Sequence, residues 1–135
     1  MMTTTTTATA TKWLRRTIWL GTAAYWLGLF ILTHLPEPPR LIIVSTDKSA
    51  HFFGYLALGT AIFASLRVAG RRDPILLVLI IGLAYGAIDE WLQIPVGRSC
   101  ELNDWFADAA GIAVAVTLYA LLARWRDQRS TRSSW

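Results

Sequence analysis

The sequence predicts an all-α polytopic membrane protein: a four-transmembrane-helix bundle with both termini in the cytoplasm. Composition is the first reason, because 54% of the 135 residues are apolar and only 16% are charged, whereas about 25% of the residues in a soluble domain are charged. The second reason is that the charged residues lie between long apolar segments. The third is that no segment alternates polar and apolar residues over about ten positions, as the strands of a membrane β-barrel do.

Four apolar segments are long enough to cross a bilayer: residues 17–35, 51–68, 74–94 and 105–123, each of 18 to 21 residues. A spanning helix needs roughly 20 residues at a rise of about 1.5 Å per residue. The first segment follows a basic stretch, as in a signal peptide. It is, however, longer than the usual apolar region of about 7–15 residues, and Thr33–Pro36 is a poor cleavage site. We therefore expect it to remain in the protein as a span.

The ends of the chain and its loops are polar. Residues 1–11 are almost all threonine and alanine, so we expect a disordered tail there. A membrane domain follows at residues 12–123, and a basic tail at residues 124–135. Prolines in the loop at residues 36–50 prevent the first helix from continuing. The lone cysteine, Cys100, excludes an internal disulfide and a multi-cysteine zinc site.

Lysine and arginine are distributed unevenly between the two ends of the predicted helices. Ten of the 13 lie on the side of the termini, and three, Arg40, Lys48 and Arg98, lie on the other. Because cytoplasmic flanks are enriched in Lys and Arg, we expect a cell (inner, cytoplasmic) membrane protein with both termini cytoplasmic. The net charge of +4 then follows topology and indicates no nucleic-acid partner. The expected partner is the lipid bilayer, with the basic tail against anionic lipid.

Two polar segments, residues 47–55 (DKSAHFFGY) and 89–108 (DEWLQIPVGRSCELNDWFAD), border the apolar segments at the predicted outer side. Ionisable groups at that depth are costly and by default mark a functional site. Spacings of three or four residues place the polar groups of each segment on one helix face. The candidate ligand-binding residues are Asp47, Lys48, His51, Tyr55, Asp89, Glu90, Gln93, Arg98, Asp104 and Asp108.

Depth and small residues indicate that the acids point into the bundle. Asp89 lies 15 residues into its segment, about 22 Å along a helix, which is the outer third of a core roughly 30 Å thick. His51 lies in the first turn of its own helix, at a similar level. Gly82 and Gly86 form a G-x-x-x-G stripe that leads to Glu90, and such stripes let helices approach closely in lipid.

Some of these residues also have a purely structural explanation. Asp47 and Lys48 suit the start of a helix, and His51 alone would suit an interfacial position. The adjacent acids Asp89 and Glu90 lie within an apolar segment and are harder to explain as solvated surface. A buried acid cluster requires cationic partners. The full set of residues therefore favours a functional site.

The same residues resemble the motifs of the VanZ-like family. The resemblance runs from residue 47 to about residue 115, roughly half of the chain. Asp108 stands where many members have asparagine, and residues 101–103 replace a more serine-rich stretch, so the site is more acidic here. The matching residues are Asp47, Lys48, His51, Phe52, Tyr55, Leu58, Gly59, Asp89, Glu90, Gln93, Gly97, Arg98, Asp104, Asp108 and Gly111.

The resemblance implies a small multi-pass membrane protein. The namesake of the family is associated with low-level resistance to the glycopeptide antibiotic teicoplanin, so antibiotic resistance is an expectation that rests on resemblance alone. Some relatives carry a phosphotransbutyrylase label. These residues do not support that activity, because the chain has no phosphate-binding glycine loop.

We expect a binding or accessory protein, in which the candidate residues form an outward-facing pocket for a cell-envelope ligand. That ligand would be a lipid head group or a glycopeptide-related molecule. Arg98 would pair with a phosphate or carboxylate, Tyr55 would stack or donate a hydrogen bond, and the acids would meet amines or a cation. No cofactor is expected, the alternative being a divalent cation.

Three other functions fit some of the residues. Carboxylates and His51 could bind a hard cation, or act as acid and base in an enzyme for a lipid-linked substrate, although no dedicated nucleophile is evident. Cys100 with His51 would form a thiol dyad in such an enzyme. A small proton-coupled transporter usually has an acid near the midplane, and none occurs here. In the third alternative, the cluster only locks the bundle through ion pairs.

Overall fold

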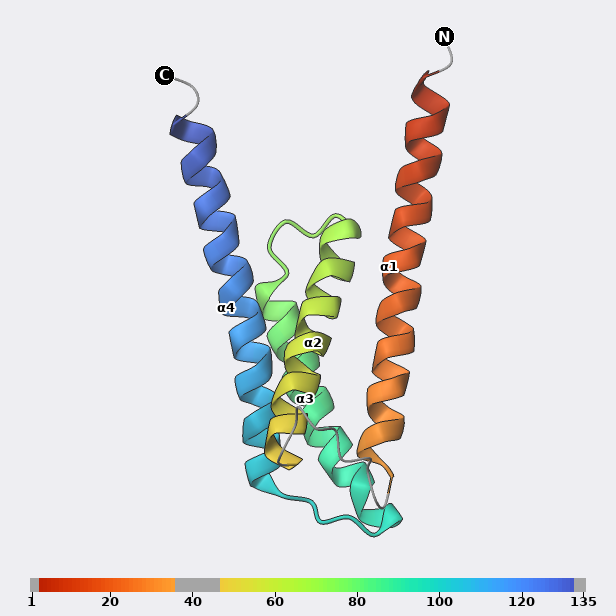
Figure 1. The fold of residues 1–135 in the computed structure, drawn as a ribbon, viewed down its shortest axis with the longest axis vertical. Helices are drawn as coiled ribbons and strands as arrows, with labels where there is room; N and C mark the ends of the chain where they lie inside the picture. The colour runs from red at the N-terminus through yellow and green to blue at the C-terminus, as the bar shows by residue number, and fades with distance from the viewer. Residues whose placement is uncertain (1–2, 36–46, 133–135) are drawn as a thin grey trace.

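The computed structural model describes residues 3–35 and 47–132, and there it is all-helical (Figure 1). No strand occurs within these ranges. The predicted fold class is therefore confirmed at the level of helices. The elements are α1 (Thr3–Thr33), α2 (Asp47–Val68), α3 (Ile75–Gln93), the 3₁₀ turn η1 (Ile94–Val96) and α4 (Leu102–Arg132).

Three of the described helices are long and apolar enough to cross a membrane. These spans are Asp47–Val68, Ile75–Val96 and Leu102–Arg126, with mean hydropathies of 1.3, 1.9 and 1.9. The prediction of four spans is thus met by α2, α3 and α4 and not by α1. The apolar half of α1 is interspersed with threonine, tyrosine and tryptophan, which lower its mean hydropathy.

The helix boundaries differ from the predicted ones at both ends of the chain. α1 begins at Thr3, so residues 3–11 are helical, where the sequence predicts a disordered tail. Extending an existing helix by one residue costs far less than nucleating a new one, and an apolar helix follows directly. α4 likewise continues through the predicted basic tail to Arg132. Most of the first loop, residues 36–46, lies outside the described residues.

The helices α2 and α3 lie between α1 and α4, which diverge toward the two termini (Figure 1). The close approach of α2 and α4 depends on Gly111, because a Cβ there would meet the backbone of Phe52 and the Leu56 nitrogen. The approach of α3 and α4 depends on Gly82, where a Cβ would lie 2.6 Å from the Ile112 side chain. The G-x-x-x-G stripe therefore packs against α4, as predicted for close helix contact.

Large apolar side chains cover the outside of the bundle, and several acids are buried inside it beside an apolar core. Leu76 is 67% exposed and Leu121 is 56% exposed, whereas Asp89 and Asp108 are buried. A protein in water would have the opposite arrangement, and a lipid environment accounts for it because lipid tails are as apolar as leucine.

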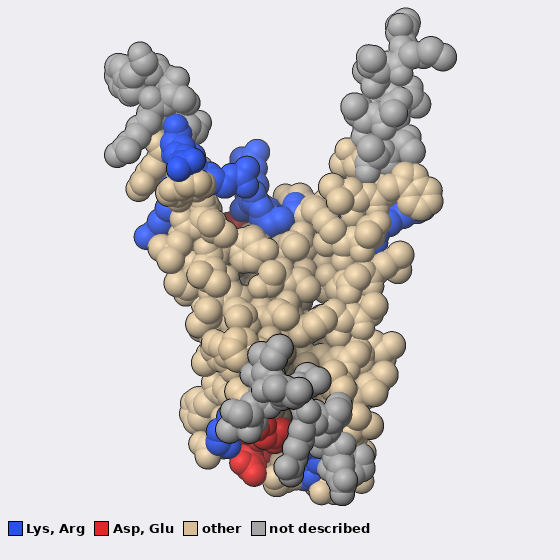
Figure 2. Space-filling view, in the orientation of Figure 1, with Lys and Arg blue, Asp and Glu red and all other residues tan. Residues whose placement is uncertain are grey.

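Charged residues gather at the two ends of the bundle (Figure 2). Most of the visible lysines and arginines lie toward the end that carries the termini, and the bright red acids lie at the other end, with smaller blue patches beside them. At this second end α1 and α3 finish and α2 and α4 begin (Figure 1). Gly97, with a left-handed φ of 81°, ends η1 there, a conformation that favours glycine.

Candidate functional site

The ten residues predicted from sequence lie at this acidic end, on α2, on α3 and the loop after it, and on α4. Seven of them form two groups, and the other three, Tyr55, Asp89 and Gln93, are buried close to the first group. We call the first the deep cluster: His51, Glu90 and Asp108, each no more than 3% exposed. We call the second the rim: Asp47, Lys48, Arg98 and Asp104, together with Glu101, which sequence reasoning did not include.

The deep cluster joins one residue from each of three helices. His51 Nδ1 lies 2.9 Å from Asp108 Oδ1 and 3.8 Å from Glu90 Oε1. The first distance is a hydrogen bond, and the second is too long for one. The His51 ring lies in the interface between α2 and α4. The two helices come close there because Gly111, one turn after Asp108, has no side chain.

The second carboxylate oxygen of Glu90 accepts a hydrogen bond from the backbone at the start of α4. The Glu101 backbone N–H donates to Glu90 Oε2 at 2.9 Å, and Glu101 directly precedes the helix. The first N–H groups of a helix have no partner within the helix, and a carboxylate there also suits the helix dipole. Gln93 Nε2 lies 3.4 Å from Glu90 Oε1 and 3.5 Å from Asp89 Oδ2. Gln93 thereby lies between the two adjacent acids.

Asp89 belongs to a separate network that joins α1 to α3. Its Oδ1 accepts hydrogen bonds from Thr33 at 3.2 Å and from Tyr85 at 3.1 Å. His34 Nδ1 lies 3.8 Å from the same oxygen. Asp89 is fully buried, and with Gln93 it has donors on both oxygens. Its role in the structure is therefore to hold α1 against α3.

Tyr55 lies beneath the deep cluster without a hydrogen-bond partner for its hydroxyl among the described residues. The residue is fully buried. Its ring is stacked on His51 at 6.4 Å and on Tyr85 at 5.8 Å between centroids. Its hydroxyl interacts electrostatically with the carboxylates of Asp108 and Asp89. These ring contacts are internal to the protein, and the role of Tyr55 toward a ligand stays a prediction.

The rim consists of ion pairs. Arg98 donates to Asp47 at 2.8 Å, and Lys48 lies 3.1 Å from Asp104 and 3.4 Å from Glu101. The Asp47, Lys48 and Glu101 side chains are about half exposed at 50%, 52% and 46%. The pair of Lys48 with Glu101 is exposed on both sides and contributes little to stability, whereas the side chains of Asp104 and Arg98 are only 6% and 13% exposed.

Hydrogen bonding lowers the pKa of Glu101 below its ordinary value of 4.5, first from the Ser99 hydroxyl and then from Lys48. The contribution of this contact to stability is therefore present above pH 4.5 and is lost as the pH falls through the lowered pKa.

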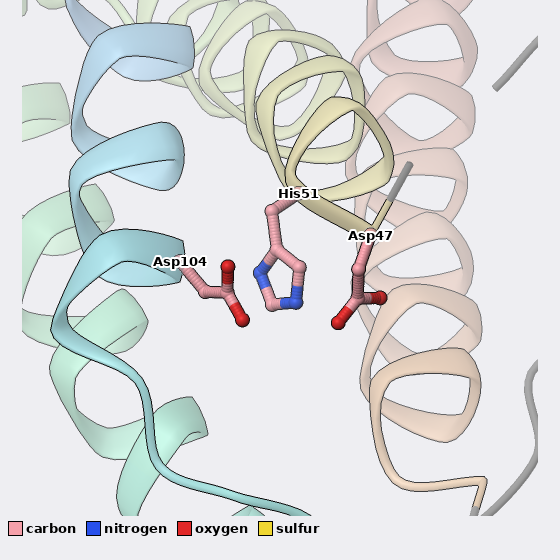
Figure 3. A group of neighbouring side chains, drawn as sticks. All are labelled: Asp47, His51 and Asp104. Atoms are coloured by element: carbon pink, nitrogen blue, oxygen red, sulfur yellow. The ribbon is translucent and has the colours of Figure 1, made fainter. Parts of the chain in front are cut away.

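Figure 3 shows how His51 relates to the rim. Its ring lies between Asp104 on α4 and Asp47 at the start of α2, with one ring nitrogen on the side of each. Within the described part of the chain, two three-residue groups could hold a metal ion: Asp47, His51 and Asp104, and the deep cluster itself. In each group the ligand atoms lie within 4.8 Å of one another. His51 is common to both.

Positive and negative charges are balanced differently in the two groups. The rim pairs Arg98 and Lys48 with nearby acids. In the buried part that the structure describes, Asp89, Glu90 and Asp108 face only His51 and the half-buried His34 as cations. Burying a charge without a partner is very costly. The deep cluster therefore has an excess of carboxylates that a cation would compensate.

The sequence interpretation missed three residues and assigned one differently. Tyr85 lies four residues before Asp89, so helical spacing contained the signal for it. Thr33 and Glu101 contact the acids from α1 and from the loop before α4, which no spacing rule would predict. Arg98 was expected to meet an external phosphate or carboxylate, and the structure pairs it with Asp47.

Two further features lie apart from the deep cluster. Cys100 is exposed on the loop between η1 and α4. An open hollow lies beside Lys12, Trp13, Arg15, Arg16, Thr17, Trp19 and Leu20, all of them on the exposed half of α1 that leads away from Thr33. Neither feature contributes to the acidic end.

Comparison with known proteins identifies the family. The model of the VanZ/LLP1 family matches residues 3–123, which is most of the chain. The chain belongs to the VanZ/LLP1 family. The predicted resemblance is thereby confirmed, and the VanZ/LLP1 match includes all ten candidate residues. No curated protein and no solved structure matches the chain significantly.

Proposed function

We propose that this VanZ/LLP1-family protein is an accessory membrane protein that binds a cell-envelope ligand at its acidic end. The part of the ligand that enters the deep cluster carries positive charge, as the amine of a lipid head group or of a glycopeptide does. The main support for this proposal is that buried carboxylates outnumber buried cations. The carboxylates come from α3 and α4 and lie around His51 of α2.

In the proposal, the acidic end of the molecule lies on the extracytoplasmic side of the membrane. Lysine and arginine gather at the end with the two termini (Figure 2), and such enrichment is typical of the cytoplasmic side. The apolar half of α1 packs on α2, where Thr22 Oγ1 lies 2.8 Å from Ser65 Oγ and Tyr25 donates to the Gly54 carbonyl. We include α1 as a fourth span in the inner membrane because this contact places it beside α2.

The geometry favours a cationic group over an anionic one. Arg98 and Lys48, the residues that would attract phosphate, are already paired with Asp47, Asp104 and Glu101. The deep carboxylates, in contrast, lack enough cations. A positive group of the ligand would therefore gain more at this end than a negative one.

The proposal is tested with the purified chain in nanodiscs that contain equal amounts of phosphatidylethanolamine and phosphatidylglycerol. Native mass spectrometry measures which lipid remains bound. We expect a severalfold excess of retained phosphatidylethanolamine, lost in the double variant Glu90→Gln/Asp108→Asn.

The matched control is Asp73→Asn, an acid-to-amide change at the opposite end of α3. Asp73 Oδ1 accepts a hydrogen bond from the Ile75 backbone N–H, and asparagine retains that acceptor. The control should keep the preference for phosphatidylethanolamine. Equal retention of the two lipids by the wild type, or a preference that survives the double substitution, would refute the proposal.

A further inference from the structure

We propose that the deep cluster binds one divalent first-row metal ion, Zn²⁺ or Mn²⁺, through His51, Glu90 and Asp108. This inference rests on the proposed function, because it names a cation that the same buried carboxylates would take. A metal ion held here would occupy the same carboxylates as the positive group of a ligand, so the two would compete for the deep cluster.

The distances within the deep cluster suit a shared ion. Ligands that each lie about 2.1 Å from a tetrahedral metal are separated by roughly 3.4 Å. His51 Nδ1 lies 2.9 Å from Asp108 Oδ1 and 3.8 Å from Glu90 Oε1, so the two separations bracket that value. The three ligand atoms all lie within 4.8 Å of one another. Small side-chain rotations would bring them around one ion.

An unpartnered buried oxygen provides an independent indication. Asp108 is 1% exposed, and its Oδ2 has no hydrogen-bond partner among the described residues. Its Oδ1 contacts His51, so the free oxygen of the same carboxylate belongs to the cluster. Buried polar atoms in native proteins normally have a partner, and a bound ion would supply one.

Charge balance favours a divalent ion. Glu90 and Asp108 are both acids, and a neutral imidazole of His51 completes the set, so a +2 ion would make the group electrically neutral. The remaining deep acid, Asp89, already has donors from Thr33 and Tyr85. A single protonated His51 would leave one of the two carboxylates uncompensated in a buried position.

The surroundings hold the proposed ligands in place. The Glu101 N–H fixes Glu90 through Oε2 and leaves Oε1 toward His51. One ring nitrogen of His51 lies on the side of Asp47 (Figure 3), and metal-binding histidines usually direct their second nitrogen toward a carboxylate or carbonyl. The alternative group of Asp47, His51 and Asp104 is less suitable, because Arg98 and Lys48 already pair with its two acids.

The donor set selects the kind of metal. Imidazole nitrogen suits zinc and iron, and carboxylate oxygen suits manganese, magnesium and calcium. One nitrogen with two carboxylates therefore favours Zn²⁺ or Mn²⁺ over Ca²⁺, which prefers six to eight oxygen ligands. Three protein ligands also leave a coordination position open.

The test uses the full chain, purified with a chelator and then freed of it in nanodiscs. Isothermal titration with Zn²⁺ and Mn²⁺ should give one ion per chain, and Co²⁺ should give a visible spectrum typical of nitrogen and oxygen ligands. Asp108→Asn and Glu90→Gln should each weaken binding by at least about 100-fold, more than the loss of an outer-shell partner does. Asp73→Asn should bind as the wild type does.

Folding of the variants is checked by circular dichroism, and Glu90→Gln retains an oxygen that can accept from the Glu101 N–H. No saturable binding by the wild type would overturn the inference. Binding that is lost equally in Asp73→Asn, or that is unchanged in Asp108→Asn and Glu90→Gln, would also overturn it.

The same preparations separate this inference from the proposed function. Phosphatidylethanolamine retention that depends on Glu90 and Asp108, without metal binding, would overturn the metal site and support the lipid proposal. Metal binding at the deep cluster without any lipid preference would do the reverse.

Discussion

The deep cluster and the rim are built from the same kinds of side chain, yet they differ in charge balance. At the rim, Arg98 and Lys48 have acids at 2.8 and 3.1 Å, and much of this surface is exposed. In the deep cluster, Glu90 and Asp108 share His51, and one oxygen of Asp108 has no partner among the described residues. The two groups thus differ in the partners of their acids: the rim acids pair with lysine or arginine, and the two deep acids have only His51 between them.

The largest expected effect comes from separating the helices that carry the two groups. Gly111→Ala places a Cβ against the backbone of Phe52 and Leu56, and overpacking of this kind costs about 1–3 kcal/mol. Both the deep cluster and the rim join α2 to α4, so both should be disrupted. Reversible unfolding in detergent, followed by circular dichroism, measures the change.

Gly28→Ala is the matched control, because a Cβ on α1 at that position meets nothing within 4 Å. It should be neutral, or stabilising by up to about 1 kcal/mol through helix propensity. Equal losses of stability in the two variants would show that the contact at Gly111 does not hold α2 to α4.

The next effect on stability should differ between the adjacent acids Asp89 and Glu90. Asp89→Asn keeps one oxygen for Thr33 and Tyr85 but places an NH2 group opposite the Gln93 amide, and it should destabilise the apo protein by about 1–3 kcal/mol. Glu90→Gln removes one of the uncompensated charges and should leave apo stability unchanged or higher. Thermal unfolding with and without Zn²⁺ measures both variants.

Zn²⁺ should raise the melting temperature of the wild type and of Asp89→Asn and have no effect on Glu90→Gln. If Glu90→Gln were the less stable apo variant and Zn²⁺ stabilised it normally, Glu90 would act only as a cap for α4. The contrast between the deep cluster and a purely structural acid would then disappear.

The smallest effect is expected at the rim. Asp47→Asn removes the partner of Arg98, and because the Asp47 side chain is 50% exposed, the loss should be no more than about 1 kcal/mol. Added salt should reduce the difference from the wild type further. A loss as large as that of Asp89→Asn, measured in the same unfolding experiment, would mean that the rim is energetically equivalent to the buried network.

Much of this arrangement could be predicted because helical spacing is a local property. Asp104 and Asp108, four residues apart, come to one face of α4, and Gly82 and Gly86 face the same helix through Ile112 and Asp108. The shared face of Asp47 and His51 follows from their spacing once α2 begins at Asp47, four residues before the predicted segment at residues 51–68.

Other parts depend on contacts between distant segments. The bond from Thr33 to Asp89 requires the packing of α1, and the Glu101 N–H reaches Glu90 only because the loop after η1 turns at Gly97. The pairing of Arg98 with Asp47 is likewise set by that loop. The α1 boundary was mispredicted because a polar threonine stretch can extend a helix that apolar residues have already formed.

The most direct test of the central claim, that the deep cluster and not the rim takes a cation, is anomalous diffraction above the zinc absorption edge from crystals grown with Zn²⁺. The account predicts one peak at about 2.0–2.2 Å from atoms of His51, Glu90 and Asp108, absent in Asp108→Asn. A peak only between Asp47 and Asp104, only at exposed acids, or nowhere on the protein would contradict it.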